Sequence, residues 1–521
     1  MAELILSVVL ACCFVYASYN SFGRCIHMLQ LNSYQYAGYF RTIFRIRSYF
    51  IPYFFICVFA LPVAIFVRNR YASSIIISVL FVLFGLCRKP DKRAKKKLVY
   101  TKRVKRLIVT DSILCAIACA FIIIMRGKLV SLIVPVIFYA LSAFLVLLSN
   151  IINTPIEKCI NLYYINDAKK ILKDSNAEVI GITGSYGKTS VKFYLAELMR
   201  EKYDVLNTPS SYNTPMGVVR TIRERMTAVN EVFVCEMGAR HVGDIKELCD
   251  IAHPDCGIIT SIGEQHLETF HTFENIKKTK LELADAVEKK GKGLIFINAD
   301  SVKDAKKLPY TNIITYGTTP DCDYAISDIS FNESGMTFTV SSKENGSFTY
   351  TTRLLGAHNA LNLAGAIAVA NMHGIPLPEL YTRVKRIKPI EHRQELRPMQ
   401  DGIIIDDAFN SNPTGAKAAL DTLACFDGCK ILITPGMVEL GEREYELNRK
   451  FGMQAAAVCD YVFLVGRLHT ESIYEGLTGS GFDTNKISVS ASFKDAMAQA
   501  SSMHVQGKRV ILIENDLPDN Y

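Results

Sequence analysis

The stretch that decides the fold of this sequence runs Glu178-Val-Ile-Gly-Ile-Thr-Gly-Ser-Tyr-Gly-Lys-Thr-Ser190. Residues 178–183 predict a buried strand, the glycine-rich part predicts a loop, and Val191–Lys202 predicts an amphipathic helix. A strand, a glycine-rich loop and a helix in this order cradle phosphate, because backbone N–H groups and the helix N-terminus face anionic oxygens. The expected nucleotide-binding residues are Gly184, Ser185, Tyr186, Gly187, Lys188, Thr189 and Ser190.

The composition shows that the two ends of the chain differ. The 521 residues are 50% hydrophobic and 21% charged, with a mean hydropathy of +0.17, which excludes a disordered chain and is too apolar for an ordinary soluble enzyme. The net charge of +9 is local, since eleven basic residues and one acid lie between Arg88 and Arg106. A basic run beside apolar stretches is typical of a membrane face, so we expect no nucleic-acid partner.

The first 155 residues predict a five-span transmembrane domain. The basic loops between the first two spans and between the third and fourth are expected in the cytoplasm, which puts the N-terminus outside and the rest of the chain inside. We therefore expect a multi-pass plasma-membrane protein in contact with lipid, with cytoplasmic catalytic domains. The expected spans are Leu4–Phe22, Ser48–Val67, Tyr71–Cys87, Leu107–Met125, which holds Asp111 near one end, and Leu129–Ile151.

The 15 cysteines predict neither a disulfide framework nor a zinc site. No C-x-x-C pair occurs, and several cysteines lie in apolar stretches, where they act as small hydrophobic residues. Cys425 and Cys429 are four residues apart, but no second Cys or His pair lies near them in the sequence. The pattern favours a reducing compartment.

Several separated motifs carry a resemblance to a known family. They are Thr183–Lys192, Ser211–Gly217, Val232–Ala239, Gln265–Phe270 with Lys280, Leu355–Asn362, Glu391–Arg393, Gly402–Pro413 and Pro435–Gly441. In this order and spacing the sequence resembles the Mur ligases, which are ATP-dependent amide-forming enzymes of cell-wall precursor synthesis. The likeness is closest to the D-alanyl-D-alanine-adding member and covers residues 177–507.

The resemblance implies a role for each motif residue. The Lys188 ammonium would neutralise phosphate, and the Thr189 hydroxyl would reach Mg²⁺. The further roles that it implies are Mg²⁺ binding by Glu236, second-Mg²⁺ binding by His266 and a carbamylated Lys280, adenine contact by Asn359 and Asn362, γ-phosphate contact by Arg393 and nucleotide contact by Asp407.

Lys280 has two interpretations. With Lys277 and Lys278 it predicts a solvated helical face, and this would be favoured for the residue taken alone. The spacing of fourteen residues from His266, which the family shares, favours the carbamate instead.

The expected organisation is an α-helical transmembrane domain at residues 1–155, a P-loop Mur-ligase central domain at 175–390 and a Rossmann-like α/β C-terminal domain at 391–521. The membrane domain stands where the family has its UDP-binding domain. The implied function is that of a membrane-anchored acid–amino-acid ligase (EC 6.3.2-like). It would use ATP and Mg²⁺ to join an amino acid or D-Ala-D-Ala to a muramoyl-peptide or lipid-linked precursor.

Two alternatives remain open from the sequence. One is a poly-γ-glutamate synthase-like ligase, which also combines a membrane segment with a Mur core; the longer D-alanyl-D-alanine-type motifs favour the first interpretation. The other is a transporter or scaffold whose ATP site drives conformational change. Retention of Lys280 at its distance from His266 argues against the latter, because a scaffold needs no carbamylated metal ligand.

Overall fold

The computed structural model describes residues 1–45, 47–88, 96–332, 335–409, 411–467 and 470–516. The chain divides into two units, one made by residues 1–162 and the other beginning at residue 163. Each unit has its own hydrophobic core. Part of the basic run expected at the membrane face, residues 89–95, lies outside the described residues.

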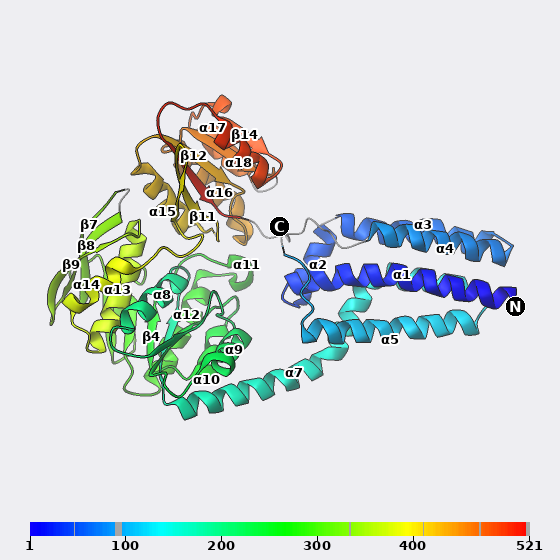
Figure 1. The fold of residues 1–521 in the computed structure, drawn as a ribbon, viewed down its shortest axis with the longest axis horizontal. Coiled ribbons are helices and arrows are strands. Elements are labelled where there is room, and N and C mark those ends of the chain that lie inside the picture. The colour runs from blue at the N-terminus through cyan, green and yellow to red at the C-terminus, as the bar shows by residue number, and fades with distance from the viewer. Residues whose placement is uncertain (46, 89–95, 333–334, 410, 468–469, 517–521) are drawn as a thin grey trace. The chain divides into compact units, whose positions relative to one another are not determined.

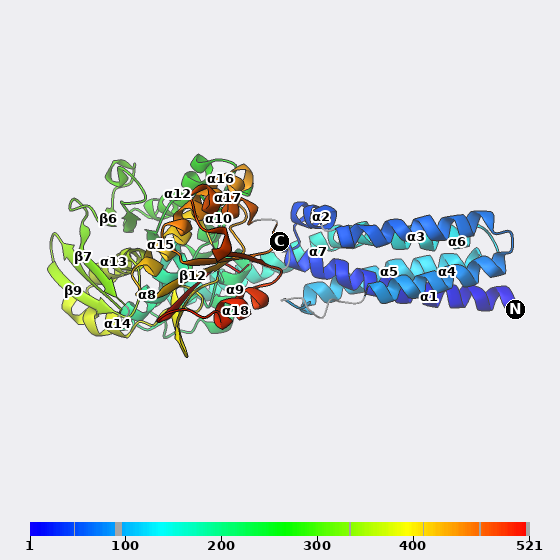
Figure 2. The ribbon, with the colours of Figure 1, turned by 90° about the horizontal axis from the view of Figure 1, so that it is seen from above.

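The first unit is a bundle of helices, in which α1, α3, α4 and α5 run side by side (Figures 1 and 2). Its buried core includes Phe14, Ile56, Phe81 and Leu107, while many large apolar side chains face outward. The helices are α1 (Ala2–Leu31), α2 (Tyr36–Arg45), α3 (Arg47–Phe66), α4 (Arg70–Cys87), α5 (Lys102–Ile124), α6 (Val130–Ala140) and α7 (Ser142–Ser175), the last of which continues into the second unit.

Four helices of the described chain are long and apolar enough to cross a membrane, namely α1, α4, α5 and α7. Tyr53–Phe66 of α3 and Val130–Ala140 are shorter apolar helices. The fifth expected span, Leu129–Ile151, is not one continuous helix: it is interrupted at Leu141, and the Ser142 hydroxyl donates to the Tyr139 carbonyl at this point. The count of five crossings stays a prediction.

The second unit begins with a nine-stranded sheet in the order β2-β3-β1-β4-β5-β6-β7-β8-β9. Its strands from β2 to β7 are parallel, and β7, β8 and β9 form an antiparallel extension. The strands are β1 (Glu178–Thr183), β2 (Val205–Asn207), β3 (Val232–Glu236), β4 (Cys256–Ile259), β5 (Ile295–Asn298), β6 (Ile313–Gly317), β7 (Tyr324–Asn332), β8 (Gly335–Ser342) and β9 (Gly346–Thr352).

Helices cover both faces of this sheet because β1 is apolar on both sides. Ile180 and Ile182 pack in the core that contains α8 and α13, whereas Val179 packs in the core that contains α9, α10 and α12. The helices are α8 (Lys188–Met199), α9 (Pro215–Arg225), α10 (Asp244–Ala252), α11 (Leu267–Phe270), α12 (Phe273–Glu288), α13 (Ala357–Met372) and α14 (Leu380–Arg386). Helix α8 begins three residues before the predicted Val191.

A second, six-stranded sheet has the order β10-β11-β15-β12-β13-β14, with only β10 antiparallel. The alternation of strands and helices expected after residue 177 is thereby confirmed as two α/β sheets. The elements are β10 (Glu395–Met399), β11 (Gly402–Asp407), α15 (Pro413–Ala424), β12 (Cys429–Thr434), α16 (Glu444–Ala456), β13 (Tyr461–Val465), α17 (Glu471–Gly479), β14 (Ile487–Ser490), α18 (Phe493–Ser502) and β15 (Arg509–Glu514).

Candidate active site

The candidate phosphate-binding loop lies between β1 and α8, and its geometry requires its two glycines. Gly184 and Gly187 have φ angles of 153° and 79°, where a side chain is strained. A Cβ on Gly184 would lie 2.1 Å from the Thr260 hydroxyl oxygen, and one on Gly187 would lie 2.4 Å from Oδ1 of Asn362. The loop therefore packs closely against the chain after β4 and against α13.

The segment after β4 fixes the shape of this loop. The Ser185 hydroxyl donates to the Gly263 carbonyl at 2.9 Å, and the Tyr186 hydroxyl donates to the Glu264 carbonyl at 2.6 Å. The Tyr186 N–H donates to Oγ of Ser261 at 2.6 Å. Ser185 and Tyr186, which were predicted to bind the nucleotide, thus use their side chains to hold the loop in its conformation. The sequence pattern did not indicate this arrangement.

Lys188 is the first residue of α8 and is half-buried. Its ammonium donates to the Gly184 carbonyl at 2.6 Å and to the Ser185 carbonyl at 3.0 Å. Burial lowers the pKa of Lys188 to about 8; the charge of Glu236 opposes this shift and that of Arg393 adds to it. Two cations near one helix N-terminus favour an anionic ligand.

Glu236, at the end of β3, lies fully buried among donors. Its Oε1 accepts from the Thr189 hydroxyl and from Nδ2 of Asn213, each at 3.0 Å, and its Oε2 accepts from the Lys192 ammonium at 3.0 Å. Burial by itself would raise the pKa of this carboxyl, but the charges of Lys192 and Lys188 and the hydrogen bonds outweigh it, so the pKa is lowered. Glu236 is therefore an ionised carboxylate.

The Thr189 hydroxyl and the Glu236 carboxylate fit a Mg²⁺ ion. Mg²⁺ prefers oxygen ligands and is commonly held by one or two protein groups together with water and substrate phosphate. Two such oxygens stand together here at the start of α8. Among the described residues, no group of three or more His, Cys, Asp or Glu side chains is suited to hold a metal. Cys425 and Cys429 therefore belong to no such group.

His266 precedes α11 in the left-handed region, with a φ of 53°. Its Nδ1 lies 2.5 Å from Oε2 of Glu439, and this contact joins the first sheet's domain to the second. In the described chain no hydrogen bond links His266 to Lys280. The charge of Lys188 contributes to lowering the pKa of each of the two residues.

Lys280, in α12, is only 2% exposed, so the solvated face expected for the residue alone is wrong. Lys278, two residues earlier on the helix, is exposed. Burial, followed by the charge of Lys188, lowers the pKa of Lys280 well below its usual range, while Asp244 and Glu282 oppose the shift. Lys280 lies on the buried side of α12 with Ile276, Leu283 and Ala284, which are three or four residues away on the same face.

The junction between the two α/β domains places Arg393 and Asp407 near the loop. Nη2 of Arg393 donates to the Thr189 hydroxyl at 3.3 Å, and its guanidinium lies 4.3 Å from the centre of the Phe409 ring. Burial raises the pKa of Asp407 to about 6, opposed by a hydrogen bond from Gln394 and by the charge of Arg393. The structure therefore brings Lys188, Thr189, Glu236 and Arg393 together, with Asp407 adjacent.

The two asparagines of α13 differ in their surroundings. The Asn359 amide is buried, accepting from the Tyr194 hydroxyl at 2.9 Å and donating to the Leu355 carbonyl at 2.8 Å. Asn362 lies against Gly187 of the loop. Asn359 thus ties α13 to α8, whereas Asn362 borders the loop directly.

Sequence reasoning missed several residues that complete the site. Lys192, Asn213 and Glu439 lie inside the quoted motifs, so their positions were visible although their roles were not. Glu514, the last residue of β15, gave no signal beyond being an acid after an apolar run. It is buried, its Oε1 accepts from the Ser411 hydroxyl at 2.5 Å, and burial raises its pKa well above the usual range.

Fold and site together define a P-loop protein with two α/β domains. Residues 182–370 match the model of the Mur ligase middle domain, and residues 392–514 match that of the Mur ligase glutamate ligase domain. Over these residues the chain belongs to the Mur ligase family.

Several relatives share the name UDP-N-acetylmuramoyl-tripeptide–D-alanyl-D-alanine ligase (MurF). The protein of Bacillus subtilis is 33% identical over 305 residues, which are 58% of this chain and 65% of that protein. The Escherichia coli protein is 27% identical, over 65% of this chain and 75% of its own length. The MurF structure from Thermotoga maritima, in complex with ADP, has a TM-score of 0.61 at 26% identity and covers 68% of this chain and 80% of its own. This chain thus spans slightly less than two thirds of the Bacillus protein.

Proposed function

We propose that this protein is a membrane-anchored, ATP-dependent ligase that joins an amine to a carboxylate of a cell-wall precursor. The observation that carries the proposal is the convergence of Lys188, Thr189, Glu236 and Arg393 at the C-terminal end of the central strands. Support comes from the family of residues 182–514, from the name shared by the relatives and from the ADP complex of the Thermotoga protein.

The proposed reaction has two steps. A carboxylate oxygen of the acceptor attacks the γ-phosphorus of ATP, the bond to the bridging oxygen of ADP breaks, and an acyl phosphate forms. The amine then attacks the acyl carbon, inorganic phosphate leaves and the amine loses a proton. Lys188 and Arg393 offset charge on the transferring group, and the planar guanidinium of Arg393 suits phosphate. Mg²⁺ held by Thr189 and Glu236 would neutralise phosphate oxygens.

Lys280 and His266 form the second part of the proposed site. The lowered pKa of Lys280 favours the neutral amine. The nitrogen of a neutral amine attacks the carbon of CO₂ and loses a proton, which gives a carbamate. A carbamate supplies anionic oxygen ligands for a second Mg²⁺, which an ammonium would repel. His266, half-buried and with a pKa lowered by burial, would supply a neutral nitrogen to the same ion.

The acceptor and the location complete the proposal. Residues 1–155 anchor the ligase as a multi-pass protein of the plasma membrane, and its α/β domains act in the cytoplasm, where ATP and Mg²⁺ are available. The acceptor is a muramoyl peptide, UDP-linked or lipid-linked, and the amine is an amino acid or D-Ala-D-Ala. Mass spectrometry of precursors after depletion of the protein tests this. Accumulation of a precursor with a free peptide carboxylate supports the proposal, and unchanged precursor pools contradict it.

A further inference from the structure

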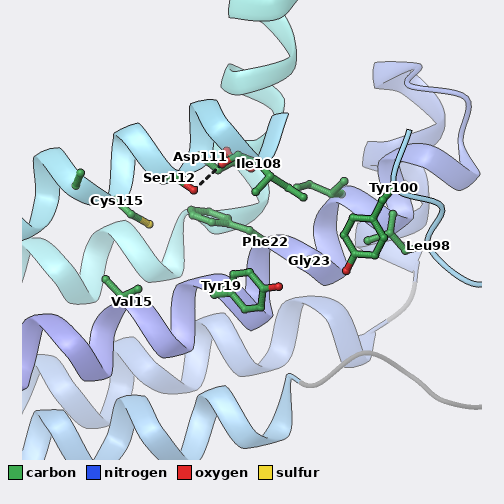
Figure 3. A pocket seen from close by; sticks show the side chains of 12 residues that line it. Val15, Tyr19, Phe22, Gly23, Leu98, Tyr100, Ile108, Asp111, Ser112 and Cys115 are labelled. Carbon is green, nitrogen blue, oxygen red and sulfur yellow. Dashed lines mark hydrogen bonds between the residues drawn. The ribbon is translucent and has the colours of Figure 1, made fainter. Parts of the chain in front are cut away.

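Outside the candidate active site, the first unit contains a mainly apolar cavity of about 210 Å³ between α1 and α5 (Figure 3). Its lining includes Tyr19, Phe22 and Cys115 and no Lys, Arg or His. Among the residues that the structure describes, nothing identifies an occupant for this cavity. The contact between the two α/β domains, in contrast, joins polar side chains through defined hydrogen bonds and ion pairs, and these define a role for one of them.

Glu439, in the domain of the second sheet, contacts two side chains in the domain of the first sheet. Its Oε2 lies 2.5 Å from Nδ1 of His266, and its Oε1 lies 3.5 Å from Nη2 of Arg240. A glutamate carboxylate is ionised at neutral pH and can then only accept a hydrogen bond. The proton of the bond to His266 therefore sits on Nδ1.

The other ring nitrogen of His266 is left available. Nε2 makes no hydrogen bond with the residues that the structure describes, and it is not fully buried. The side chain as a whole is 16% exposed. A neutral imidazole that donates from Nδ1 carries its lone pair on Nε2, so Nε2 is the nitrogen that can bind a metal ion.

The backbone on both sides of this contact has an uncommon conformation. His266 and Glu439 have φ angles of 53° and 63°, in the left-handed region. Gly441 lies against the chain that follows His266, where a Cβ on the glycine would be 3.6 Å from the Glu268 nitrogen. Backbone strain of this kind persists only where the surrounding structure over-determines it, and it gathers at functional sites. The junction of the domains therefore sets the positions of both side chains.

We propose that Glu439 is a positioning residue that fixes the tautomer and the orientation of His266 and so presents Nε2 to a divalent cation. Histidine ligands commonly donate their second N–H to a carboxylate, which orients the ring and raises its basicity toward the metal. This inference rests on the proposed function, in which His266 binds the second Mg²⁺. It extends that function because Glu439 and His266 belong to different domains. The ring is oriented only while the two domains are in contact, so domain closure and binding of the ion favour each other.

Three substitutions separate this role from a general contribution to the domain junction. Glu439→Ala removes the acceptor, whereas Glu439→Gln keeps an amide oxygen that can still accept from Nδ1. Arg443→Ala is the matched control. The Arg443 guanidinium pairs with Glu264 across the same junction, and it makes no hydrogen bond to His266 in the described chain.

The experiment uses the full chain, labelled with ¹⁵N-histidine, together with β,γ-methylene-ATP, bicarbonate and Mn²⁺. Mn²⁺ suits the same oxygen ligands as Mg²⁺ and is paramagnetic, so electron spin-echo envelope modulation detects a histidine nitrogen bound to it. The wild type should show this coupling, and His266→Asn should not. In Glu439→Ala, the Mn²⁺ dissociation constant of the coupled site should rise about 10–100-fold. Glu439→Gln should keep most of the affinity, and Arg443→Ala should keep all of it.

Three results would overturn the inference. Unchanged coupling and affinity in Glu439→Ala would leave His266 as a metal ligand that needs no positioning by Glu439. Equal losses in Glu439→Ala and Arg443→Ala would show that the junction as a whole is responsible. Absence of coupling in the wild type would remove His266 from the metal site. In each case, phosphate release that depends on acceptor and amine, measured with ATP on the same preparation, shows whether the proposed ligase function still stands.

Discussion

The ammonium of Lys192 lies 3.0 Å from Oε2 of Glu236, and both side chains are withdrawn from solvent, at 0% and 1% exposure. This buried pair orients the carboxylate whose other oxygen bonds the Thr189 hydroxyl. Lys192 holds Oε2, and Oε1 accepts from the Thr189 hydroxyl and from Nδ2 of Asn213, so three donors fix the carboxylate beside the P-loop. The pair thus positions a ligand.

Replacing one partner of this pair should destabilise the protein more than replacing both. Lys192→Met leaves an unpaired buried carboxylate and should cost about 3–5 kcal/mol in the free energy of unfolding, whereas the double variant Lys192→Met/Glu236→Gln should recover much of that loss. Thermal unfolding followed by circular dichroism measures both. The exposed pair Lys417 and Asp421 is the control, since Lys417→Met should cost about 1 kcal/mol or less. Equal effects of the single and double variants would contradict the prediction.

The affinity for ADP should fall as the pH rises above about 8. Bound phosphate favours protonated Lys188, whose pKa burial lowers to about 8, so binding takes up a proton above that pH. The dissociation constant, measured by calorimetry with Mg²⁺, should approach a slope of about tenfold per pH unit.

In the unliganded chain, the free energy of unfolding should rise over the pH range in which the affinity for ADP falls. Unfolded Lys188 keeps its proton up to about 10.5, so this residue makes the stability of the folded chain rise from about pH 8 towards pH 10.5. Lys188→Arg keeps its charge and should bind ADP without this pH dependence. A flat affinity profile in the wild type would show that Lys188 does not contact phosphate.

Lys280→Ala should lose most of the ligase activity, and a short carboxylate should restore part of it. Acetate can enter the vacated space and supply the anionic oxygens of the proposed carbamate, and depletion of bicarbonate should slow only the wild type. The control is Lys278→Ala, because Lys278 is exposed on the same helix and its loss should leave turnover unchanged. Full activity of Lys280→Ala at low bicarbonate would eliminate the carbamate.

The predicted topology can be checked by cysteine labelling. In a background where the native cysteines are replaced, an impermeant maleimide added outside intact cells should modify Lys128→Cys but not Ser175→Cys. The reason is that the basic loops between the predicted spans are expected in the cytoplasm, which would put the end of α7 on the same side. Labelling of Ser175→Cys from outside would reverse the orientation.

The sequence predicted the parts of the site that are formed by residues close together in the chain. The run from Glu178 to Ser190 contains its own strand, turn and helix start, so the P-loop was visible without tertiary information. The burial of Lys280 was not visible, because its neighbours Lys277 and Lys278 suggest a polar face and only the sheet beneath α12 decides which side is covered. The contact of His266 with Glu439 joins residues 173 positions apart, a distance that no local pattern spans.

In the fold, too, local features were predicted and features that depend on distant contacts were not. Apolar runs predicted α1, α4 and α5, whereas a hydropathy pattern does not register the interruption at Leu141, because the residues on both sides of it are apolar. The antiparallel strands β7–β9 were also missed as a unit, since their pairing depends on the register with the edge of a parallel sheet. Such contacts are set by the assembled domain.

The central claim is that this chain forms amide bonds at the expense of ATP, and phosphate release measures it most directly. The full-length protein in vesicles should release inorganic phosphate with ATP and Mg²⁺ only when a muramoyl-tripeptide acceptor and D-Ala-D-Ala are both present. Lys188→Ala should lower this rate about a hundredfold or more while the protein stays in the vesicles. Phosphate release that needs neither acceptor nor amine, or wild-type turnover in Lys188→Ala, would contradict the claim and favour a transporter or scaffold driven by ATP.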